Sequence, residues 1–291
     1  MFYKEYDPAM LKKLQETYIL IVKDFLAFCF EHQLCVIGAY GTVLGAVRHG
    51  GFIPWDDDID LYLPRTDYEK LLELQRQGIC APGYEVQSAE NNAWYPKPFA
   101  TFQKLNTVCI SEDQVGKRGN ERMHLAIDLF PLDALPDDEA AAKRMARHAR
   151  IWCMLCFLRS GSEPDIPFPN PVLHKAAWIS CKCITLALRG FGVSNRWMQK
   201  QIDRWARSGE NLPSHRYSYV GSYTTLYAWV DKDAVDQFEY RPFGDISLPV
   251  MRNPEDYLAR RYGADYMQLP PLAQRRNHTA AVLDFGEEME R

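Results

Sequence analysis

Several features that would assign this 291-residue sequence to a special class are missing from it. No stretch reaches about 18 uncharged apolar residues, so we expect no transmembrane helix. Residues 1–5 lead straight into a charged helical pattern, so we expect no signal peptide and a cytoplasmic location. Internal repeats and low-complexity tracts are also lacking, and the aromatic content of 13% argues against disorder. These absences leave a globular protein of one large domain or two small ones.

A disulfide framework is not expected, because no secretory signal accompanies the eight cysteines. Most of them lie in apolar runs, as reduced core thiols do: Cys29, Cys35, Cys109, Cys153 and Cys156. The spacing of Cys153 and Cys156, and that of Cys181 and Cys183, could in principle hold zinc. Both pairs lie in apolar helical patterns, however, so we expect core thiols and no zinc.

Acidic residues are scarce in one long segment of a chain whose net charge is −4. Between Lys143 and Arg207 there are twelve basic and three acidic residues, a net charge of +9. Such a block suggests an anionic partner (a membrane surface, a phosphorylated acceptor or nucleic acid), and a solvated helical face explains it at least as well. The basic residues are not interleaved with aromatic ones and match no known motif, so we expect no nucleic-acid partner.

Helical and strand patterns alternate along the first part of the chain. Helices are predicted from Asp7-Pro8 onwards, over 42–48, and from a capping box at Thr66-x-x-Glu69 to Gly78. Strands are predicted over 34–38, 59–63, 84–88, 99–105, 107–111 and 125–130, and Pro131 and Pro136 close this region. The pattern predicts an α+β fold with a β-sheet core over 1–136, a basic helical insertion over 137–210 with a proline-rich joint at 164–171, and a C-terminal part, 211–291, that completes the core.

A cluster of acidic residues follows Pro54-Trp55 and consists of Asp56, Asp57, Asp58 and Asp60. Mutual repulsion, with no basic residue among them, favours a bound cation. Ile59 separates Asp58 from Asp60, so on a strand both carboxylates would share one face while Ile59 enters the core. Hard oxygen ligands of this kind suit Mg²⁺ or Mn²⁺. The alternative, an acidic surface turn, would not need the alternating apolar residues that follow.

A third carboxylate candidate, Asp128, lies between apolar residues on a predicted central strand. An aspartate there is costly unless it is paired or metal-bound, so we predict that Asp128 belongs to the metal site. The alternative is a hydrogen-bonded core residue. Asp133, which Ala-Leu-Pro follows, is instead predicted to form a turn.

Candidates for binding a donor phosphate lie near the acidic cluster. Gly41 and Thr42 follow a predicted strand and begin a helix, whose backbone N–H groups could bind a phosphate, although one Gly-Thr pair is a weak signal. Arg48 and His49 end that helix, and Arg48 could make a forked phosphate contact or a salt bridge to an aspartate. Lys104, between two predicted strands, could hold a phosphate or keep an edge strand soluble.

The run GTVLGAVRHGGFIPWDDDIDL, residues 41–61, resembles the signature of the LicD family, phosphocholine transferases that decorate bacterial glycans and teichoic acids. The domain is also similar to that of the fukutin-related ribitol-phosphate transferases. The resemblance continues over 127–133 and resumes at Pro249 and over 256–267, leaving out the basic helical insert. It implies a nucleotidyltransferase-like mixed sheet flanked by helices. Carried over by position, Asp58 and Asp60 would be catalytic metal ligands, and Asp128 would be a third ligand or the base that activates the acceptor hydroxyl.

The resemblance also implies a reaction. The family's donors are CDP-linked alcohols, so the chain would transfer a phosphorylated alcohol such as phosphocholine to a glycan, lipid-linked glycan or teichoic-acid hydroxyl and release CMP. Metal ions that bridge donor oxygens would neutralise charge on the phosphoryl group and on the leaving CMP. Two alternatives are a nucleotidyltransferase that moves NMP with release of pyrophosphate, and an inactive glycan- or nucleotide-binding module. The triplet Tyr40-Gly41-Thr42 departs from the paired glycines or Gly-Ser that are frequent in the broader superfamily.

Weaker patterns concern the substrate and the membrane. Four aromatic residues could form a cage for a quaternary ammonium group: Trp55, Tyr62, Trp94 and Tyr95. Three residues near the C-terminal end could close the site: Arg275, Arg276 and His278. In 172–189, Lys175, Lys182 and Arg189 are seven residues apart and most other positions are apolar. This pattern predicts either an interfacial helix on anionic lipid at the inner face of the membrane, or a buried helix that exposes a narrow stripe.

Overall fold

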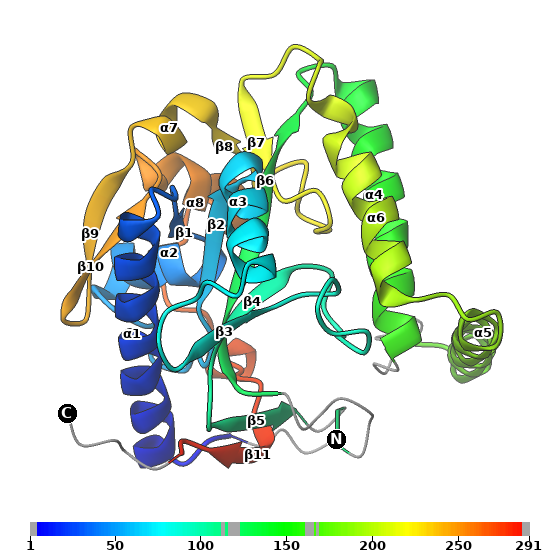
Figure 1. The fold of residues 1–291 in the computed structure, drawn as a ribbon, viewed down its shortest axis with the longest axis horizontal. Coiled ribbons are helices and arrows are strands. Elements are labelled where there is room, and N and C mark those ends of the chain that lie inside the picture. Colours follow the sequence, from blue (N-terminus) through cyan, green and yellow to red (C-terminus); the bar gives the residue numbers. More distant parts are fainter. Residues whose placement is uncertain (1–4, 112–113, 116–122, 161–165, 167–168, 287–291) are drawn as a thin grey trace.

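The computed structural model describes residues 5–111, 114–115, 123–160, 166 and 169–286 (Figure 1). In chain order, its elements are α1 (Pro8–Glu31), β1 (Ile37–Gly38), α2 (Tyr40–His49), β2 (Asp60–Pro64), α3 (Arg65–Arg76), β3 (Tyr84–Gln87), β4 (Ala100–Lys104), β5 (Val108–Ser111), β6 (Leu125–Leu135), α4 (Glu139–Ser160), α5 (Pro171–Gly190), α6 (Asn195–Ala206), β7 (Arg216–Ser218), β8 (Val230–Asp231), α7 (Lys232–Asp236), β9 (Glu239–Phe243), β10 (Ile246–Val250), α8 (Pro254–Tyr262) and β11 (Ala280–Asp284). Helices and strands share the chain around a mixed sheet, so the predicted α+β fold is confirmed.

The main sheet has seven strands, five of them in the order β1-β2-β6-β4-β3. β2 and β6 are parallel and pair Asp60 with Asp128, whereas the other neighbours along this path are antiparallel. β7 pairs with the far end of β6 and also with β8. Two antiparallel pairs, β9–β10 and β5–β11, lie outside this sheet. The parallel pair therefore brings two aspartates that are far apart in sequence to the same level of the sheet.

Helix α1 is fixed to the sheet by a helical stripe of buried side chains that ends in aromatic contacts. The helix begins as predicted, because the Asp7 carboxylate accepts hydrogen bonds from the backbone N–H groups of Ala9 and Met10. Near its other end, the ring centroid of Phe25 lies 4.8 Å from that of Phe102 on β4. Tyr84 of β3 stacks on the same Phe102 ring at 4.6 Å. These contacts join α1, β3 and β4 in one core.

Strand β6 runs five residues beyond the predicted end, and the turn predicted at Asp133 is wrong. β4 pairs with β6 only up to Leu129, and β7 pairs with it from Asp133 onwards. Pro131 lies between the part of β6 that pairs with β4 and the part that pairs with β7. A residue without an N–H group therefore interrupts no hydrogen-bonded ladder on that side of β6. The strand can therefore pass through Pro131, and Asp133 becomes a buried strand residue.

Two further local predictions need correction. Of the strand predicted over 34–38, only Ile37 and Gly38 pair with β2. The capping box is wrong, because α3 begins at Arg65 after Pro64 and has no side-chain cap. Thr66 is thus already inside the first turn, and the Glu69 carboxylate accepts a hydrogen bond from the Arg207 guanidinium instead.

The segment predicted as a helical insertion contains three helices. α4 and α6 pack side by side at the edge of the sheet, with Met198 and Ile202 of α6 against Cys153 and Cys156 of α4 (Figure 1). Cys183 on α5 is exposed, so the core-thiol prediction is wrong for that residue. Half of the proline-rich joint, including Pro164 and Pro167, lies outside the described residues. Within the described ranges, no single helix is long and apolar enough to cross a membrane, and one pair, Pro171–Gly190 with Asn195–Gly209, meets that criterion only jointly and is bent by 108°.

A buried ion pair ties this helical part to the sheet. Arg65 donates to both carboxylate oxygens of Asp133, at 2.7 and 2.8 Å, and to Asp203 of α6 at 3.1 Å. Only 1% of the Asp133 side chain is exposed. The bidentate geometry satisfies a carboxylate that the interior could not otherwise accept.

Arg65→Met is therefore expected to lower the free energy of unfolding by about 3–5 kcal/mol, because it leaves the Asp133 charge buried and unpaired. Urea unfolding followed by far-UV circular dichroism measures this loss. In the double variant Arg65→Met/Asp133→Leu, which removes both charges, most of the stability should return. A loss below about 1 kcal/mol in the single variant, the range of an exposed ion pair, would contradict the interpretation.

Candidate active site

A cavity of about 620 Å³ lies where the main sheet, α2, α4 and α8 meet. Its acidic residues are Asp56, Asp58 and Asp60, and its basic residues are Arg150 and Arg261. Its aromatic residues are Tyr40, Phe99, Phe130, Phe157, Tyr219, Tyr223 and Tyr262. The cavity thus combines an acidic end with aromatic and basic walls.

The acidic end is built by the parallel strand pair. Asp60 begins β2 and is the register partner of Asp128 on β6, and residues paired in this way point to the same face of a sheet. Ile59 and Ile127, each next to one of these aspartates in the sequence, are buried on the opposite face of the sheet. Asp58 precedes β2, yet it lines the cavity together with Asp60. The structure therefore brings Asp58, Asp60 and Asp128 to one region, while their roles stay predictions.

The positive charge near these carboxylates is not enough to offset their burial and their mutual repulsion. Burial, reinforced by the neighbouring carboxylates, raises the pKa of Asp56 to about 8 and that of Asp58 to about 6. Burial and the charges of Asp58 and Asp128 also raise the pKa of Asp60 well above its usual value. An ionised form that is disfavoured in this way is what a cation in the site would stabilise.

Lys97 is a residue of this region that the sequence analysis missed. Its ammonium group lies 2.5 Å from Oδ1 of Asp128 and also interacts with the charges of Asp60 and Asp58. Burial acts to lower the pKa of Lys97, but Asp128 and the other carboxylates outweigh burial and raise it. A lysine set between Pro96 and Pro98 in a weakly charged stretch was the available signal.

Asp57 differs from its neighbours, because it is not among the residues that line the cavity. It is buried, and its Oδ2 accepts a hydrogen bond of 2.7 Å from the backbone N–H of His278. The His278 ring also contacts this carboxylate, with Nδ1 3.5 Å from Oδ1, and this side-chain contact is the main reason why the pKa of His278 rises to about 9. His278 thus holds the C-terminal segment against the acidic loop, while Arg275 stacks over the Trp55 ring at 4.8 Å.

The predicted phosphate-binding residues separate into two groups. Gly41 lines the cavity, and a Cβ atom there would lie 2.9 Å from Oδ2 of Asp56, so only glycine leaves this approach open. Thr42 is buried, and its hydroxyl accepts a hydrogen bond from the backbone N–H of Asp60, which fixes β2 to α2. Tyr40 takes a φ of 40°, a left-handed conformation that favours glycine. This conformation explains why paired glycines would suit the position.

Arg48, His49 and Lys104 are not among the residues that line the cavity, and their role in binding a donor phosphate stays a prediction. The Arg48 guanidinium donates to the backbone carbonyls of Tyr266 and Gln268 and to the His49 ring, because both residues lie at the end of α2 remote from Gly41. Lys104 pairs with Leu125, three residues along β6 from Asp128. Three residues of a strand correspond to about 10 Å.

The aromatic residues also differ from those proposed for a cage. Tyr62 and Tyr95 are buried in the core and cannot contact a ligand. Among the residues that do line the cavity, Tyr40 and Phe130 meet edge to face at 5.5 Å, and Phe130 lies 5.0 Å from Tyr219. These rings come from distant parts of the chain, so no local pattern could identify them.

The donor set of the cavity fits a hard divalent cation, since it consists of carboxylate oxygens with an excess of negative charge. Across the described residues, however, no three His, Cys, Asp or Glu side chains are grouped closely enough to hold an ion. The Lys97 ammonium group is already paired with one carboxylate oxygen of Asp128. This pairing accounts for part of the separation between Asp128 and the other carboxylates. The predicted Mg²⁺ or Mn²⁺ site thus stays a prediction.

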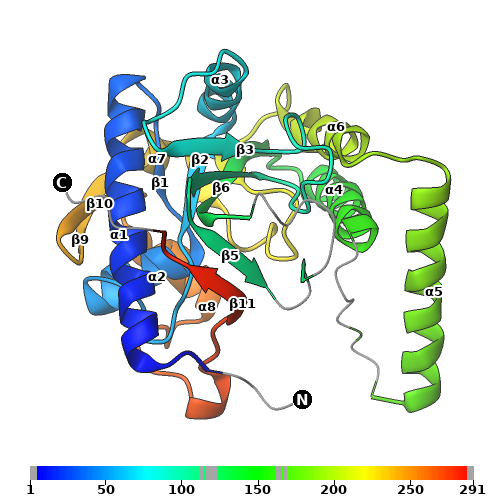
Figure 2. The ribbon, with the colours of Figure 1, turned by 60° about the horizontal axis from the view of Figure 1, so that its bottom comes forward.

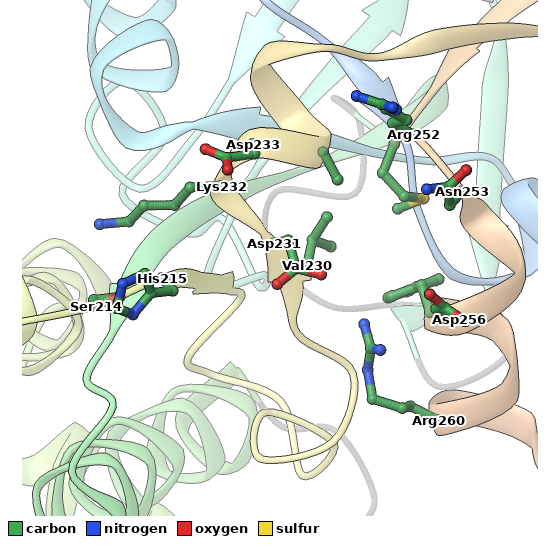
Figure 3. Close-up of a pocket in the computed structure, with 13 residues that line it drawn as sticks. Ser214, His215, Val230, Asp231, Lys232, Asp233, Arg252, Asn253, Asp256 and Arg260 are labelled. Carbon is green, nitrogen blue, oxygen red and sulfur yellow. The ribbon is translucent and has the colours of Figure 1, made fainter.

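A second cavity of about 520 Å³ lies between β8, α7 and α8 (Figure 3). Its labelled side chains carry mixed charges, with Asp231, Asp233 and Asp256 beside Lys232 and Arg260. None of the predicted site residues lines it. The first cavity contains Gly41, Asp58 and Asp60 of the predicted site and therefore remains the candidate active site.

Comparison with known proteins shows which family the chain is similar to. The chain is 26% identical over 276 residues to the lipopolysaccharide cholinephosphotransferase LicD of Haemophilus influenzae, with 92% of this chain and 95% of that protein covered. An uncharacterized protein of Rickettsia typhi is 23% identical over 134 residues, or 45% of this chain and 36% of that protein. Residues 36–148, which include all three predicted metal-site aspartates, match the family described as LicD/FKTN/FKRP, nucleotidyltransferase domain. The resemblance to the LicD family that the sequence predicted is therefore confirmed, with the match to the family's nucleotidyltransferase domain at 36–148.

Proposed function

We propose that this protein transfers a phosphorylated alcohol of the phosphocholine type from a CDP-linked donor to a hydroxyl group of a glycan or lipid-linked glycan, with release of CMP. The observation that carries the proposal is the juxtaposition of carboxylates and aromatic rings in one cavity. Carboxylates suit a metal-bound diphosphate, and ring faces attract a quaternary ammonium group. The relationship to a lipopolysaccharide cholinephosphotransferase supports the same group and a glycan acceptor.

In this proposal, Asp58, Asp60 and Asp128 would hold Mg²⁺ or Mn²⁺. Such an ion, when bound, supplies neutralisation of charge on the phosphoryl group and on the leaving CMP. Gly41 leaves room for the donor beside Asp56, and the guanidinium groups of Arg150 and Arg261 are placed to attract its phosphates. Tyr223, with 65% of its surface exposed, lines the same cavity and would contact a bound alcohol.

The test is a panel of CDP-linked donors carrying choline, ethanolamine, aminoethylphosphonate or ribitol, offered with candidate glycans in the presence and absence of Mg²⁺. We expect CMP as the nucleotide product, strict dependence on the divalent ion, and preference for a cationic alcohol because of the aromatic walls. Chromatography of the nucleotide products measures the result. Transfer of NMP with release of pyrophosphate, when nucleoside triphosphates are offered in place of the CDP-linked donors, would establish the nucleotidyltransferase alternative. Binding of donor without any product would establish the inactive binding module.

A further inference from the structure

Helix α5 is apolar on nearly all sides and is nevertheless exposed. Of its residues, only Thr185 is buried. Val172 has 74% of its surface exposed, Leu186 has 68%, and Phe191, directly after the helix, has 87%. Of the two alternatives that the sequence left open, the buried helix with a narrow exposed stripe is therefore wrong. An apolar helix in this position requires something to cover it.

The position of α5 leaves that surface open. Figure 2 shows α5 at the side of the molecule, with α4 and α6 between it and the sheet. Its described anchors are polar contacts with α4, in which Thr185 donates to the Leu158 carbonyl and Arg189 to the Arg159 carbonyl. The helix is thus held by one side and presents the rest of its circumference outwards.

The charges of this region have one sign. No acidic residue occurs between Asp165 and Asp203, whereas Lys175, Lys182, Arg189, Arg196 and Lys200 all fall in that interval. Trp178 is part of the exposed surface, and the Lys182 ammonium group lies 5.1 Å from the centre of its ring. Tryptophan and lysine side chains of this kind extend from an apolar surface to the headgroup level of a bilayer.

We propose that α5, with Phe191, lies in the surface of an anionic lipid bilayer and docks the enzyme there. The exposed apolar residues would enter the acyl boundary, and the basic residues would face the headgroups. A second copy of this chain is a poorer occupant, because pairing two such helices would bring together like charges with no acidic residue between 166 and 202 to compensate them. The proposal does not depend on the reaction, since lipid binding requires no turnover.

The test uses the full chain and vesicles of phosphatidylglycerol and phosphatidylcholine, separated by flotation at low salt. We expect binding that increases with the phosphatidylglycerol fraction, decreases with salt, and shifts tryptophan emission to shorter wavelength. The variant Lys175→Gln/Lys182→Gln/Arg189→Gln should lose affinity about fivefold per residue, or about a hundredfold in total, as expected for roughly 1 kcal/mol per basic residue. Val172→Ser/Leu186→Ser/Phe191→Ser should lose binding without loss of folding, because these side chains are already exposed.

A matched control removes the same number of exposed charges elsewhere, as Lys12→Gln/Lys23→Gln/Arg76→Gln on α1 and α3. This control should bind vesicles as the wild type does, which separates a local surface from a general effect of net charge. Absence of vesicle binding by the wild type at low salt would overturn the proposal, as would equal losses in the control. A wild-type dimer in sedimentation velocity that the serine variant converts to a monomer, without vesicle binding, would assign the surface to a second copy instead. None of these results would alter the CMP-release assay.

Discussion

Asp58→Asn and Asp60→Asn are each expected to abolish transfer while leaving the fold intact. Both side chains line the cavity, and burial together with neighbouring carboxylates raises the pKa of each. Replacing one of them removes a charge that repels the others, so the free energy of unfolding should stay the same or increase. The rate of CMP release should fall by on the order of 10²–10³ or more, the scale of losing one preorganised electrostatic group.

A readout other than activity separates metal binding from other causes. Divalent ions that bind only the folded protein should raise the Tm of the wild type, and this increase should be absent from both variants. Asp57→Asn is the matched control, since it removes a carboxylate of the same loop that faces His278 and not the cavity. That variant should keep its Mg²⁺-dependent Tm increase and most of its activity. Wild-type CMP release by Asp58→Asn and Asp60→Asn would show that the metal assignment is wrong.

The parts of this site that could be predicted are those that follow from the alternation of residue types over a few positions of the sequence. Alternation around Ile59 and around Asp128 predicts two buried strands with carboxylates on one face, and the register between β2 and β6 agrees with it. The order of the residues over 41–61 also pointed to the family whose model matches residues 36–148. Local patterns thus identified these two strands, the helix starts at Asp7 and near Gly41, and the acidic cluster.

What failed depends on partners that are distant in the chain. The sequence around Asp133 is typical of a turn. In the structure, Arg65 at the start of α3 pairs with Asp133, and strand β6 continues through Pro131. Lys97 has no local reason to approach Asp128, and Arg48 turns to backbone carbonyls that belong to 266–268. In each case, tertiary packing decides which group a charged side chain pairs with, and no local pattern in the sequence indicates that partner.

Asp128→Asn is expected to lower kcat by about 10²–10⁴ with little change in donor affinity, as for the loss of a general base. Asp128 shares its level of the sheet with Asp60, and a carboxylate at this place could accept the proton of an acceptor hydroxyl. Steady-state rates of CMP release, with donor affinity measured separately by calorimetry, give the two quantities. A parallel loss of donor affinity and of the Mg²⁺-dependent Tm increase would make Asp128 a metal ligand instead.

Substitution of Lys97 distinguishes a catalytic role of Asp128 from a merely structural one. The Lys97–Asp128 contact of 2.5 Å could by itself explain a buried carboxylate, and in that case Lys97→Met and Asp128→Asn would both reduce stability and leave kcat unchanged. If Asp128 acts on the substrate, Lys97→Met leaves the base in place but adds an uncompensated charge to the acidic cluster. Mg²⁺ should then bind Lys97→Met more tightly than the wild type, since a competing cation has been removed. The double variant Lys97→Met/Asp128→Asn should recover stability but not kcat, because removing both charges relieves the unpaired lysine and restores no base.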